Sequence, residues 1–325
     1  MKITKNMWHE ELRPLYGPLN FVRGLMTRRW TQAALDFLMR RYFIGKAIEG
    51  VTTSVFSVAS RDDGHAFRVL VHRPDECPAD RKLPLMLYIH GGGYITGLPE
   101  MFNTPIKRFI DKRPCVVVTP DYRKAYSKPY PAALNDCYDS LLWAIENAAS
   151  LGADAEKIIV AGPSAGGGLT AALTLKARDM GEFEIAFQMP IYPMIDDRQP
   201  DDPDREMHGP GWDSQLNRIG WNAYLADLHE AGEDIPAYAA PMRNDDYTGF
   251  PPTITLVGTL EPFYWETIRY VEDLREAGVE VAFKEFKDCF HGFEFAASET
   301  QIGQAGLNFT YSTYSEYYDR FVGKS

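Results

Sequence analysis

The sequence has few cysteines, and they are scattered along the chain. None of the four forms a C-x-x-C pair, and no histidine is close enough to Cys77, Cys115 or Cys137 to suggest a zinc knuckle. Cys289 lies two residues before His291, but a structural metal site needs a second clustered pair of ligands. We therefore expect no metal site.

Long apolar runs and positive charge are also lacking. No stretch reaches the roughly 18 apolar residues of a membrane helix, and the N-terminus MKITKNMWHEELRP has charges where a signal peptide has its apolar core. We therefore expect a cytoplasmic, reduced protein with no membrane partner. The net charge of −11 gives no positive field for nucleic acid or anionic lipid, so neither is expected as a partner.

A chain of 325 residues that is 45% apolar can bury a large core, and we expect one large domain with an added subdomain. Residues 1–48 have a helical pattern, because apolar residues recur at spacings of three to five between charged ones. These positions are Leu25, Met26, Trp30, Ala34, Leu35, Leu38 and Phe43. Since the segment precedes any strand, it has to pack on something formed later in the chain.

Strand patterns begin at Val51. Two segments with period-two alternation, 51–60 and 66–74, flank a turn at 62–64 and predict an antiparallel hairpin. Six short apolar runs follow, most of them separated by enough chain for a helix. They are 85–89, 116–119, 158–161, 185–190, 253–257 and 279–286, and the clearest helices are 131–149 and 264–277. This pattern indicates an α/β protein with a mostly parallel, eight-stranded sheet and helices on both faces.

About sixty residues separate Pro190 from Thr253, too many for one connection. We expect residues 195–245 to form an insertion that joins residues 1–48 as a helical cap over a domain made of 49–194 and 246–325. The insertion begins with an acidic run that lacks the Gly and Glu of a good calcium loop, so a solvated loop is favoured. The run contains Asp196, Asp197, Asp201, Asp202 and Asp204.

The segment IIVAGPSAGGGLTAALTLKA combines an apolar strand, the pattern G-x-S-x-G and a helix rich in Ala and Leu. That context is typical of a nucleophile elbow, with Ser164 as the candidate nucleophile. A serine on so tight a turn needs neighbours without side chains, which Gly162 and Gly166 supply. The helix start, including the N–H of Ala165, would favour an anion. A glycine-rich turn without chemistry is the alternative.

A second motif, His90-Gly91-Gly92-Gly93-Tyr94, follows an apolar strand and precedes Ser164 by 74 residues. Three glycines let backbone N–H groups approach a tetrahedral oxyanion without steric hindrance, and HGGG loops of this kind form oxyanion holes. Together the two motifs favour acyl-transfer chemistry over a purely structural origin.

The candidate base is His291, because this architecture places nucleophile, acid and base in that order along the chain. The other histidines lie in the insertion or before the serine: His208, His229, His9, His65, His72 and His90. Glu261 directly follows the strand TITLVG and is the candidate acid, since a carboxylate there would accept the His291 Nδ1 proton. Competing acids are Glu285, Asp288 and Asp196.

These motifs resemble the hormone-sensitive-lipase-like esterases of the α/β-hydrolase superfamily. The match runs from about Leu85 to Phe293 and includes HGGGY, GPSAGGG, Leu-Glu-Pro at 260–262 and His-Gly-Phe at 291–293. Residues 121–123 and 129–136 look like that family's D-Y-R and F-P-A-A stretches, which we interpret as structural supports. Pro163, Glu261 and residues 124–127 depart from the family's usual residues.

The resemblance implies an α/β-hydrolase fold with a helical cap, oxyanion donors at Gly92, Gly93 and Ala165, and a small-molecule ester substrate with a short acyl chain. The inferred serine mechanism requires no metal or organic cofactor. The candidates for lining the substrate pocket are Tyr94, Trp212, Trp221 and Phe21. A homodimer is left open.

Two alternatives fit the same motifs. An amidase or deacetylase would use the same three residues on N-acyl substrates, with stronger protonation of a poorer leaving group. A non-catalytic ligand receptor would keep the pocket and lose the histidine, and the intact His291 argues against it.

Overall fold

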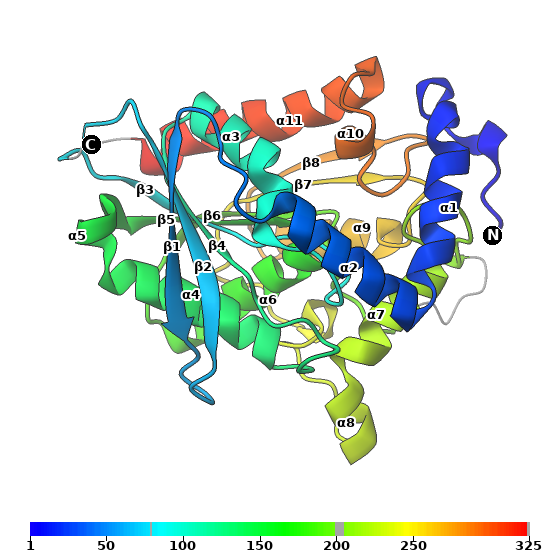
Figure 1. The fold of residues 1–325 in the computed structure, drawn as a ribbon, viewed down its shortest axis with the longest axis horizontal. Helices are drawn as coiled ribbons and strands as arrows, with labels where there is room; N and C mark the ends of the chain where they lie inside the picture. Colours follow the sequence, from blue (N-terminus) through cyan, green and yellow to red (C-terminus); the bar gives the residue numbers. More distant parts are fainter. Residues whose placement is uncertain (79, 199–204, 324–325) are drawn as a thin grey trace.

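One eight-stranded sheet forms the centre of the molecule in the computed structural model, which describes all residues except 79, 199–204 and 324–325 (Figure 1). Strand β2 runs antiparallel to its neighbours β1 and β4, and the remaining pairings are parallel. The strand order across the sheet is β1 (Val51–Ala59), β2 (Ala66–Pro74), β4 (Val116–Pro120), β3 (Leu83–Tyr88), β5 (Ala153–Pro163), β6 (Ile185–Ile191), β7 (Thr253–Gly258) and β8 (Val281–Phe286). The predicted fold class is confirmed.

Side chains alternate between the two faces of the central strands. Leu85 and Leu87 of β3 point into one core, whereas Met86 and Tyr88 point into the other. Both cores are apolar because the strand is covered on both sides, which explains why the central strands are continuous apolar runs in the sequence. The hairpin β1–β2 has more exposed positions, since β1 lies at the edge of the sheet.

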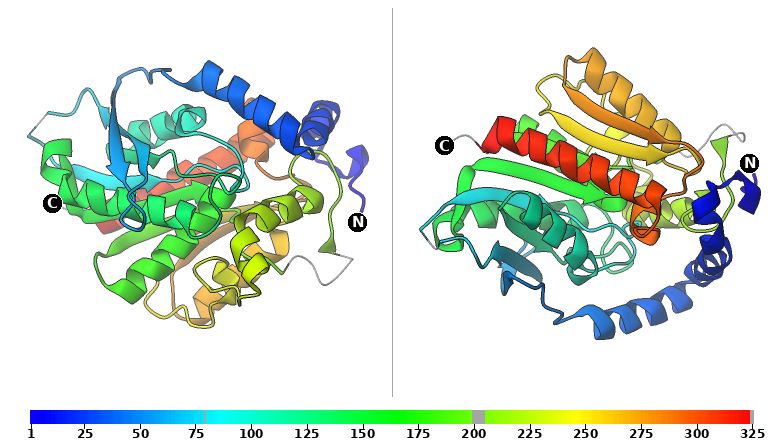
Figure 2. Two further views of the ribbon diagram at one scale, coloured as in Figure 1. Left: turned by 60° about the horizontal axis from the view of Figure 1, so that its bottom comes forward. Right: turned by 90° about the horizontal axis from the view of Figure 1, so that it is seen from above.

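Helices cover both faces of the sheet (Figure 2). One core contains side chains of α4 and α6, with α9 packed beside α6, and the other contains side chains of α3 and α11. These helices are α3 (Asn103–Lys112), α4 (Ala132–Glu146), α6 (Ala165–Met180), α9 (Tyr264–Glu276) and α11 (Gln301–Tyr317). Shorter helices are α5 (Ala148–Leu151), α8 (Ala226–Ala231) and α10 (Phe293–Ala296).

The N-terminal segment and the insertion lie together. The N-terminal segment forms α1 (Tyr16–Met26) and α2 (Arg29–Phe43), and the insertion forms α7 (Ser214–Tyr224). The Ile3 amide donates to the His208 carbonyl at 2.8 Å, and Arg23 Nε donates to Asp213 Oδ2 at 2.6 Å. Two parts of the chain that are about 200 residues apart thus meet above the sheet.

Helix α2 packs differently from its sequence pattern. Trp30 and Leu38, two of the apolar positions that define the helical pattern, are 69% and 60% exposed. Leu35 and Met39 face a cleft beneath the helix instead. Periodicity identifies the apolar positions of a helix but does not say which of them will face the body.

The acidic run at the start of the insertion is only partly described. Asp196 pairs with Arg198, and Asp197 pairs with Arg243. Asp201, Asp202 and Asp204 lie outside the described residues. Across the described part of the chain, no helix is both long and apolar enough to cross a membrane.

Candidate active site

The turn between β5 and α6 holds Ser164 in a strained backbone conformation. Its φ is 60° and its ψ is −126°, a region that non-glycine residues rarely adopt. The surroundings fix this geometry: the Ser164 amide donates to the Ile191 carbonyl at 2.9 Å, and the Ser164 carbonyl accepts from Gly168 and Met194. The serine is thus held at the end of the strand, as a nucleophile elbow requires.

The two glycines beside the serine make room for another loop. A Cβ on Gly166 would lie 2.1 Å from the Ile89 carbonyl oxygen, and a Cβ on Gly162 would lie 2.5 Å from the same atom. Ile89 is the residue just after β3. These glycines therefore let the turn after β5 and the loop after β3 touch through their backbones.

The glycines of the HGGG loop are also required by their surroundings. Gly92 and Gly93 have φ values of 131° and 59°, which favour glycine. A Cβ on Gly92 would lie 2.1 Å from the Thr96 carbonyl oxygen, and one on Gly93 would lie 1.9 Å from the Trp212 ring. The loop is therefore compact, and its backbone faces the cleft that contains Ser164.

Three backbone N–H groups near Ser164 are available to an anion. The amides of Gly92, Gly93 and Ala165 donate no hydrogen bond to any residue that the structure describes. Gly92 and Gly93 line the same cleft as Ser164, and Ala165 is the first residue of α6. Unpaired amides at a helix start and a glycine loop are suited to binding an oxyanion.

His291 is held by a buried carboxylate. Its Nδ1 donates to Glu261 Oε2, and the other carboxylate oxygen accepts from the Gly258 amide at 2.8 Å. The rings of Tyr192 and Phe263 contact the imidazole edge-on, with their centroids 4.7 and 4.8 Å from the imidazole centroid. Because Nδ1 carries the proton that Glu261 accepts, a neutral His291 has its free electron pair on Nε2.

Ser164 and His291 line one cleft of about 750 Å³. No hydrogen bond between the Ser164 hydroxyl and the His291 ring is present among the described residues. Hydrogen bonds between catalytic groups are often long in the absence of substrate and shorten when it binds. The structure thus brings the predicted nucleophile and base to the same cleft, where the hydrogen bond between their side chains is not formed.

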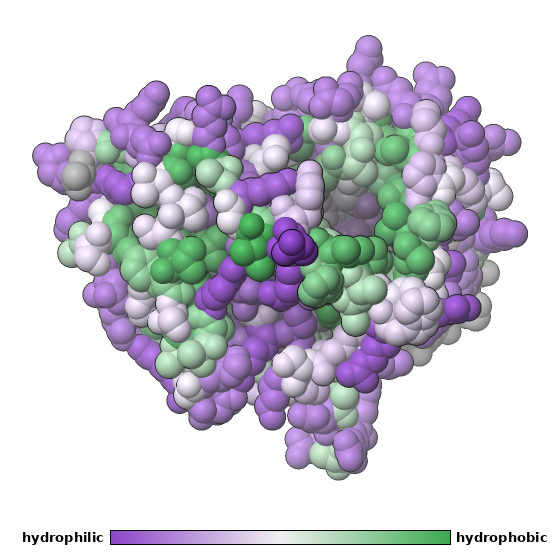
Figure 3. Space-filling model, in the orientation of Figure 1, coloured by the Kyte–Doolittle hydropathy of each residue, from purple (hydrophilic) through white to green (hydrophobic). Residues whose placement is uncertain are grey.

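The cleft is mostly apolar, and the N-terminal helices and the insertion form much of its wall. The residues of these two segments that line it are Leu19, Val22, Arg23, Met26, Leu35, Met39, Gly211, Trp212 and Leu216. Figure 3 shows the hollow on the face that carries α1 and α2. Of the four predicted pocket residues, Trp212 is in the wall.

The other three predicted pocket residues lie elsewhere. Tyr94 is buried in the core, where its hydroxyl donates to the Met194 carbonyl at 2.8 Å, and Trp221 packs against Tyr94 in that core. Phe21 is on the solvent side of α1. Residues 19, 22, 23 and 26 of α1 line the cleft instead, because they share one helical face and Phe21 lies about 100° away from Val22.

A buried lysine that the motifs did not predict supports the HGGG loop. His90 Nδ1 lies 2.8 Å from the Gly91 carbonyl, which can only accept, so Nδ1 carries the proton. Lys124 Nζ then donates to His90 Nε2 at 3.1 Å, and also to the Tyr122 carbonyl and Asp121. Burial, followed by the Lys124 charge, holds the pKa of His90 well below its usual value. Lys124 is one of the departures from the family pattern.

The D-Y-R segment has the supporting role expected of it. The Tyr122 ring stacks on His90 at 4.2 Å, and its hydroxyl donates to the His90 carbonyl at 3.0 Å. Arg123 binds the fully buried Asp136 of α4 through two nitrogens. This pairing ties the segment after β4 to the helix that follows it.

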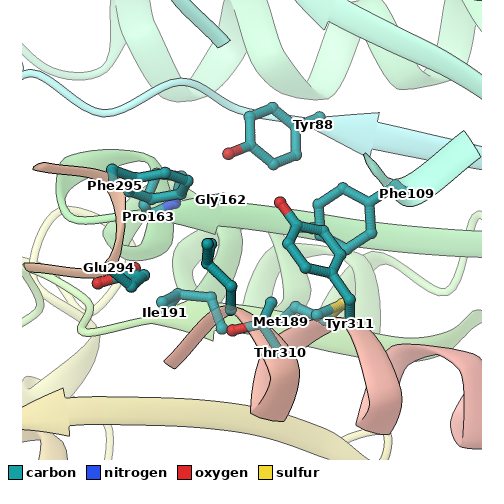
Figure 4. Close-up of a pocket in the computed structure, with 12 residues that line it drawn as sticks. Tyr88, Phe109, Gly162, Pro163, Met189, Ile191, Glu294, Phe295, Thr310 and Tyr311 are labelled. Carbon is teal, nitrogen blue, oxygen red and sulfur yellow. The ribbon is translucent and has the colours of Figure 1, made fainter. Parts of the chain in front are cut away.

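Glu294 is a second buried acid close to His291, and no sequence motif marked it. Its Oε1 accepts from the Tyr192 hydroxyl at 2.5 Å, while Oε2 has no partner among the described residues. Figure 4 shows Glu294 beside a small cavity, with the rings of Phe109 and Tyr311 on the other side. Burial in these apolar surroundings raises the pKa of Glu294 to about 7.

The raised pKa of Glu294 predicts a loss of stability with rising pH. The unfolded state releases this proton near the ordinary pKa of about 4.3, whereas the folded state keeps it up to about 7. The stabilisation of the folded state by the proton that Glu294 keeps is therefore fully present below about pH 4 and is lost as the pH rises through 7. We expect Glu294→Gln to melt several degrees higher than the unchanged chain at pH 8, with little difference at pH 5.

Thermal unfolding followed by circular dichroism at both pH values measures this difference. Glu299→Gln is the matched control, because Glu299 is exposed five residues away. Melting curves for Glu294→Gln and the unchanged chain that shift in parallel between the two pH values would contradict the prediction.

Comparison with known proteins places the chain in a family. A family model described as the alpha/beta hydrolase fold matches residues 86–295. The chain is 33% identical over 242 residues to the esterase LipI of Mycobacterium tuberculosis, covering 73% of this chain and 71% of that protein. It is 32% identical over 133 residues to the hormone-sensitive lipase of Bos taurus, covering 41% of this chain and 17% of that protein.

The fold similarity extends over nearly the whole chain. The structure of a bacterial heroin esterase superposes with a TM-score of 0.85 and 28% identity, covering 97% of this chain and 99% of that one. The α/β fold of nearly the whole chain is therefore shared with this solved esterase. The chain belongs to the hormone-sensitive-lipase-like esterases of the α/β-hydrolase superfamily, a family of carboxylic ester hydrolases.

Proposed function

We propose that the chain hydrolyses carboxylic esters with short acyl groups through Ser164, His291 and Glu261. The observation that carries this proposal is the single cleft in which Ser164, His291 and the glycine loop meet, with Glu261 bound to the far side of the imidazole. The names of the relatives, an esterase and a lipase, support the same reaction class.

In the proposed first step, His291 Nε2 takes the proton of the Ser164 hydroxyl as Oγ attacks the ester carbonyl carbon. Glu261 stabilises the resulting imidazolium and keeps Nε2 directed at the serine. The carbonyl oxygen becomes an oxyanion, and the amides of Gly92, Gly93 and Ala165 would donate to it. These donors need no reorganisation, since they have no other partner among the described residues.

The proposed second half repeats the chemistry with water. His291 gives its proton to the departing alkoxide, so that the alcohol leaves and Ser164 remains acylated. His291 then removes a proton from water as the oxygen attacks the acyl carbon. The acid is released and the proton returns to Ser164. This cycle uses side chains and backbone amides alone.

The wall beside the glycine loop supports the proposed short-acyl preference. The Trp212 ring occupies the space where a Cβ of Gly93 would stand, so a large ring lies directly against a proposed oxyanion donor. The remaining cleft extends along α1 and α2. We propose that Trp212 limits the acyl group and that the α1–α2 side accepts the alcohol. The cap is accordingly proposed to consist of residues 1–48 and 195–245.

Replacing Ser164 with Ala removes the proposed nucleophile. We expect the turnover of nitrophenyl acetate to fall on the order of 10⁴-fold or more and labelling by an organophosphate to disappear. A circular dichroism spectrum that matches the unchanged chain serves as the folding control. Turnover that survives the substitution would end the proposal.

Replacing Glu261 with Ala leaves the tautomer and charge of His291 uncontrolled. We expect kcat for nitrophenyl acetate to fall on the order of a hundredfold or more, because the imidazolium loses its buried partner. Asp288→Asn is the matched control, since Asp288 is the competing acid on the loop that carries His291. If the control loses activity and Glu261→Ala keeps it, the assignment of the acid is wrong.

Replacing Trp212 with Ala opens the proposed acyl wall. We expect the nitrophenyl ester with the highest kcat/KM to shift from a short acyl chain to a longer one, because the removed ring vacates space beside Gly93. The measurement is an acyl-length series, with Trp265→Ala as a control outside the cleft. An unchanged optimum would place the acyl group elsewhere in the cleft.

A further inference from the structure

The outward face of the cap helices is apolar and basic. Most of the exposed large apolar side chains in the described part of the chain lie between residues 21 and 44. They are Phe21, Val22, Trp30, Phe37, Leu38, Tyr42 and Ile44. We call these seven residues the cap face. Monomeric soluble proteins rarely expose contiguous apolar patches of this kind unless the patch binds something.

Helix α2 has its polarity reversed relative to an ordinary surface helix. Its exposed positions recur at helical spacing and are Arg29, Trp30, Ala33, Ala34, Phe37, Leu38, Arg41 and Tyr42. Gln32, Asp36 and Arg40 face the body instead, where Arg40 pairs with Asp36 and with Asp121. A surface helix normally turns its apolar stripe inward, so the outward stripe is available to a partner.

Both parts of the cap face lie on the same side of the molecule. Figures 1 and 2 show α1 and α2 joined end to end across the front of the body, with one side open to solvent. In Figure 3, hydrophobic side chains border the hollow that lies between these two helices. Val22 belongs both to the cap face and to the wall of the cleft, so the two surfaces are continuous.

The charge of this region is opposite to that of the whole chain. Residues 1–48 contain nine Lys and Arg and three Asp and Glu, a net charge of +6, whereas the whole chain carries −11. Between Leu12 and Ile48 the one acidic residue is Asp36, which faces inward. Arg28, Arg41 and Lys46 are exposed beside the cap face.

Local charge decides what this face attracts. Charges separated by more than about 10 Å are largely screened at 0.1 M salt, so the acidic body has little influence on a surface that contacts the cap. A symmetric dimer through this face would bring its arginines against their own copies, and like charges facing each other oppose contact. An anionic surface has no such cost.

We propose that the cap face docks on an anionic phospholipid bilayer. Helices that lie in a membrane interface combine Trp, Phe and Leu on one side with Lys and Arg at its borders, and α2 has this composition. Trp30, Phe37 and Leu38 would enter the headgroup region, while Arg28, Arg41 and Lys46 bind lipid phosphates. This docking revises the expectation drawn from net charge, and it does not depend on the proposed ester chemistry.

Flotation of the full chain with vesicles tests the docking without any substrate. We expect binding to vesicles of phosphatidylcholine mixed with phosphatidylglycerol, weaker binding to phosphatidylcholine alone, and a decrease as salt is raised. Leu38→Gln should reduce binding on the order of tenfold, since a side chain that would enter the bilayer becomes polar. Arg41→Glu should reduce binding to the anionic vesicles about fivefold or more.

The chain provides a closely matched control. Val55 on β1 is 60% exposed, like Leu38, but lies outside the cap face, so Val55→Gln should bind as the unchanged chain does. Equal melting temperatures of the variants exclude unfolding as a cause. The proposal is overturned if the unchanged chain fails to float with anionic vesicles, or if Leu38→Gln and Val55→Gln bind alike. It is also overturned if light scattering shows a dimer that Leu38→Gln abolishes, because the face would then bind a second copy.

Discussion

The structure depends on the backbone contact between the loop after β3 and the turn after β5. Gly162 and Gly166 approach the Ile89 carbonyl so closely that a Cβ at either position would overlap it. A Cβ on Gly91 would lie 3.0 Å from the Pro163 carbonyl oxygen, a tight contact without overlap. Only glycine fits the contacts at Gly162 and Gly166, and these contacts bring the serine turn and the glycine loop to the same edge of the sheet.

Several further features follow from that contact. The Ser164 backbone remains at a positive φ because its amide donates to the Ile191 carbonyl and its carbonyl accepts from the Gly168 and Met194 amides. The amides of Gly92 and Gly93 have no partner among the described residues because the loop turns its backbone toward the cleft. The energetic cost of strained and unpaired groups is offset by the large apolar cores on the two faces of the sheet.

Buried ionisable groups surround the site, and each has specific partners. Lys124 donates to His90, Asp121 and the Tyr122 carbonyl. Because its bond to His90 goes to Nε2, it favours the tautomer of His90 that carries the proton on Nδ1. Glu261 is held by His291 and the Gly258 amide. In surroundings of low polarity such bonds are stronger than in water, so they set the positions of the loops. Helices α1 and α2 contribute a different kind of surface, with apolar side chains both on the cleft side and on the solvent side.

The sequence by itself determined the fold class, the serine turn, the glycine loop and the choice of His291 and Glu261 as candidates. These features are local, because strand periodicity and glycine spacing follow from backbone sterics within a few residues. The bond between His291 and Glu261 was also predictable, since the order of elements places both residues at the carboxyl ends of neighbouring strands. Only the tertiary structure decided which way each cap helix turns, why Tyr94 and Trp221 are in the core, and that Lys124 and Glu294 are buried beside the site. Those outcomes depend on contacts between segments up to about 200 residues apart, and helical periodicity carries no information about which partner an apolar face will meet.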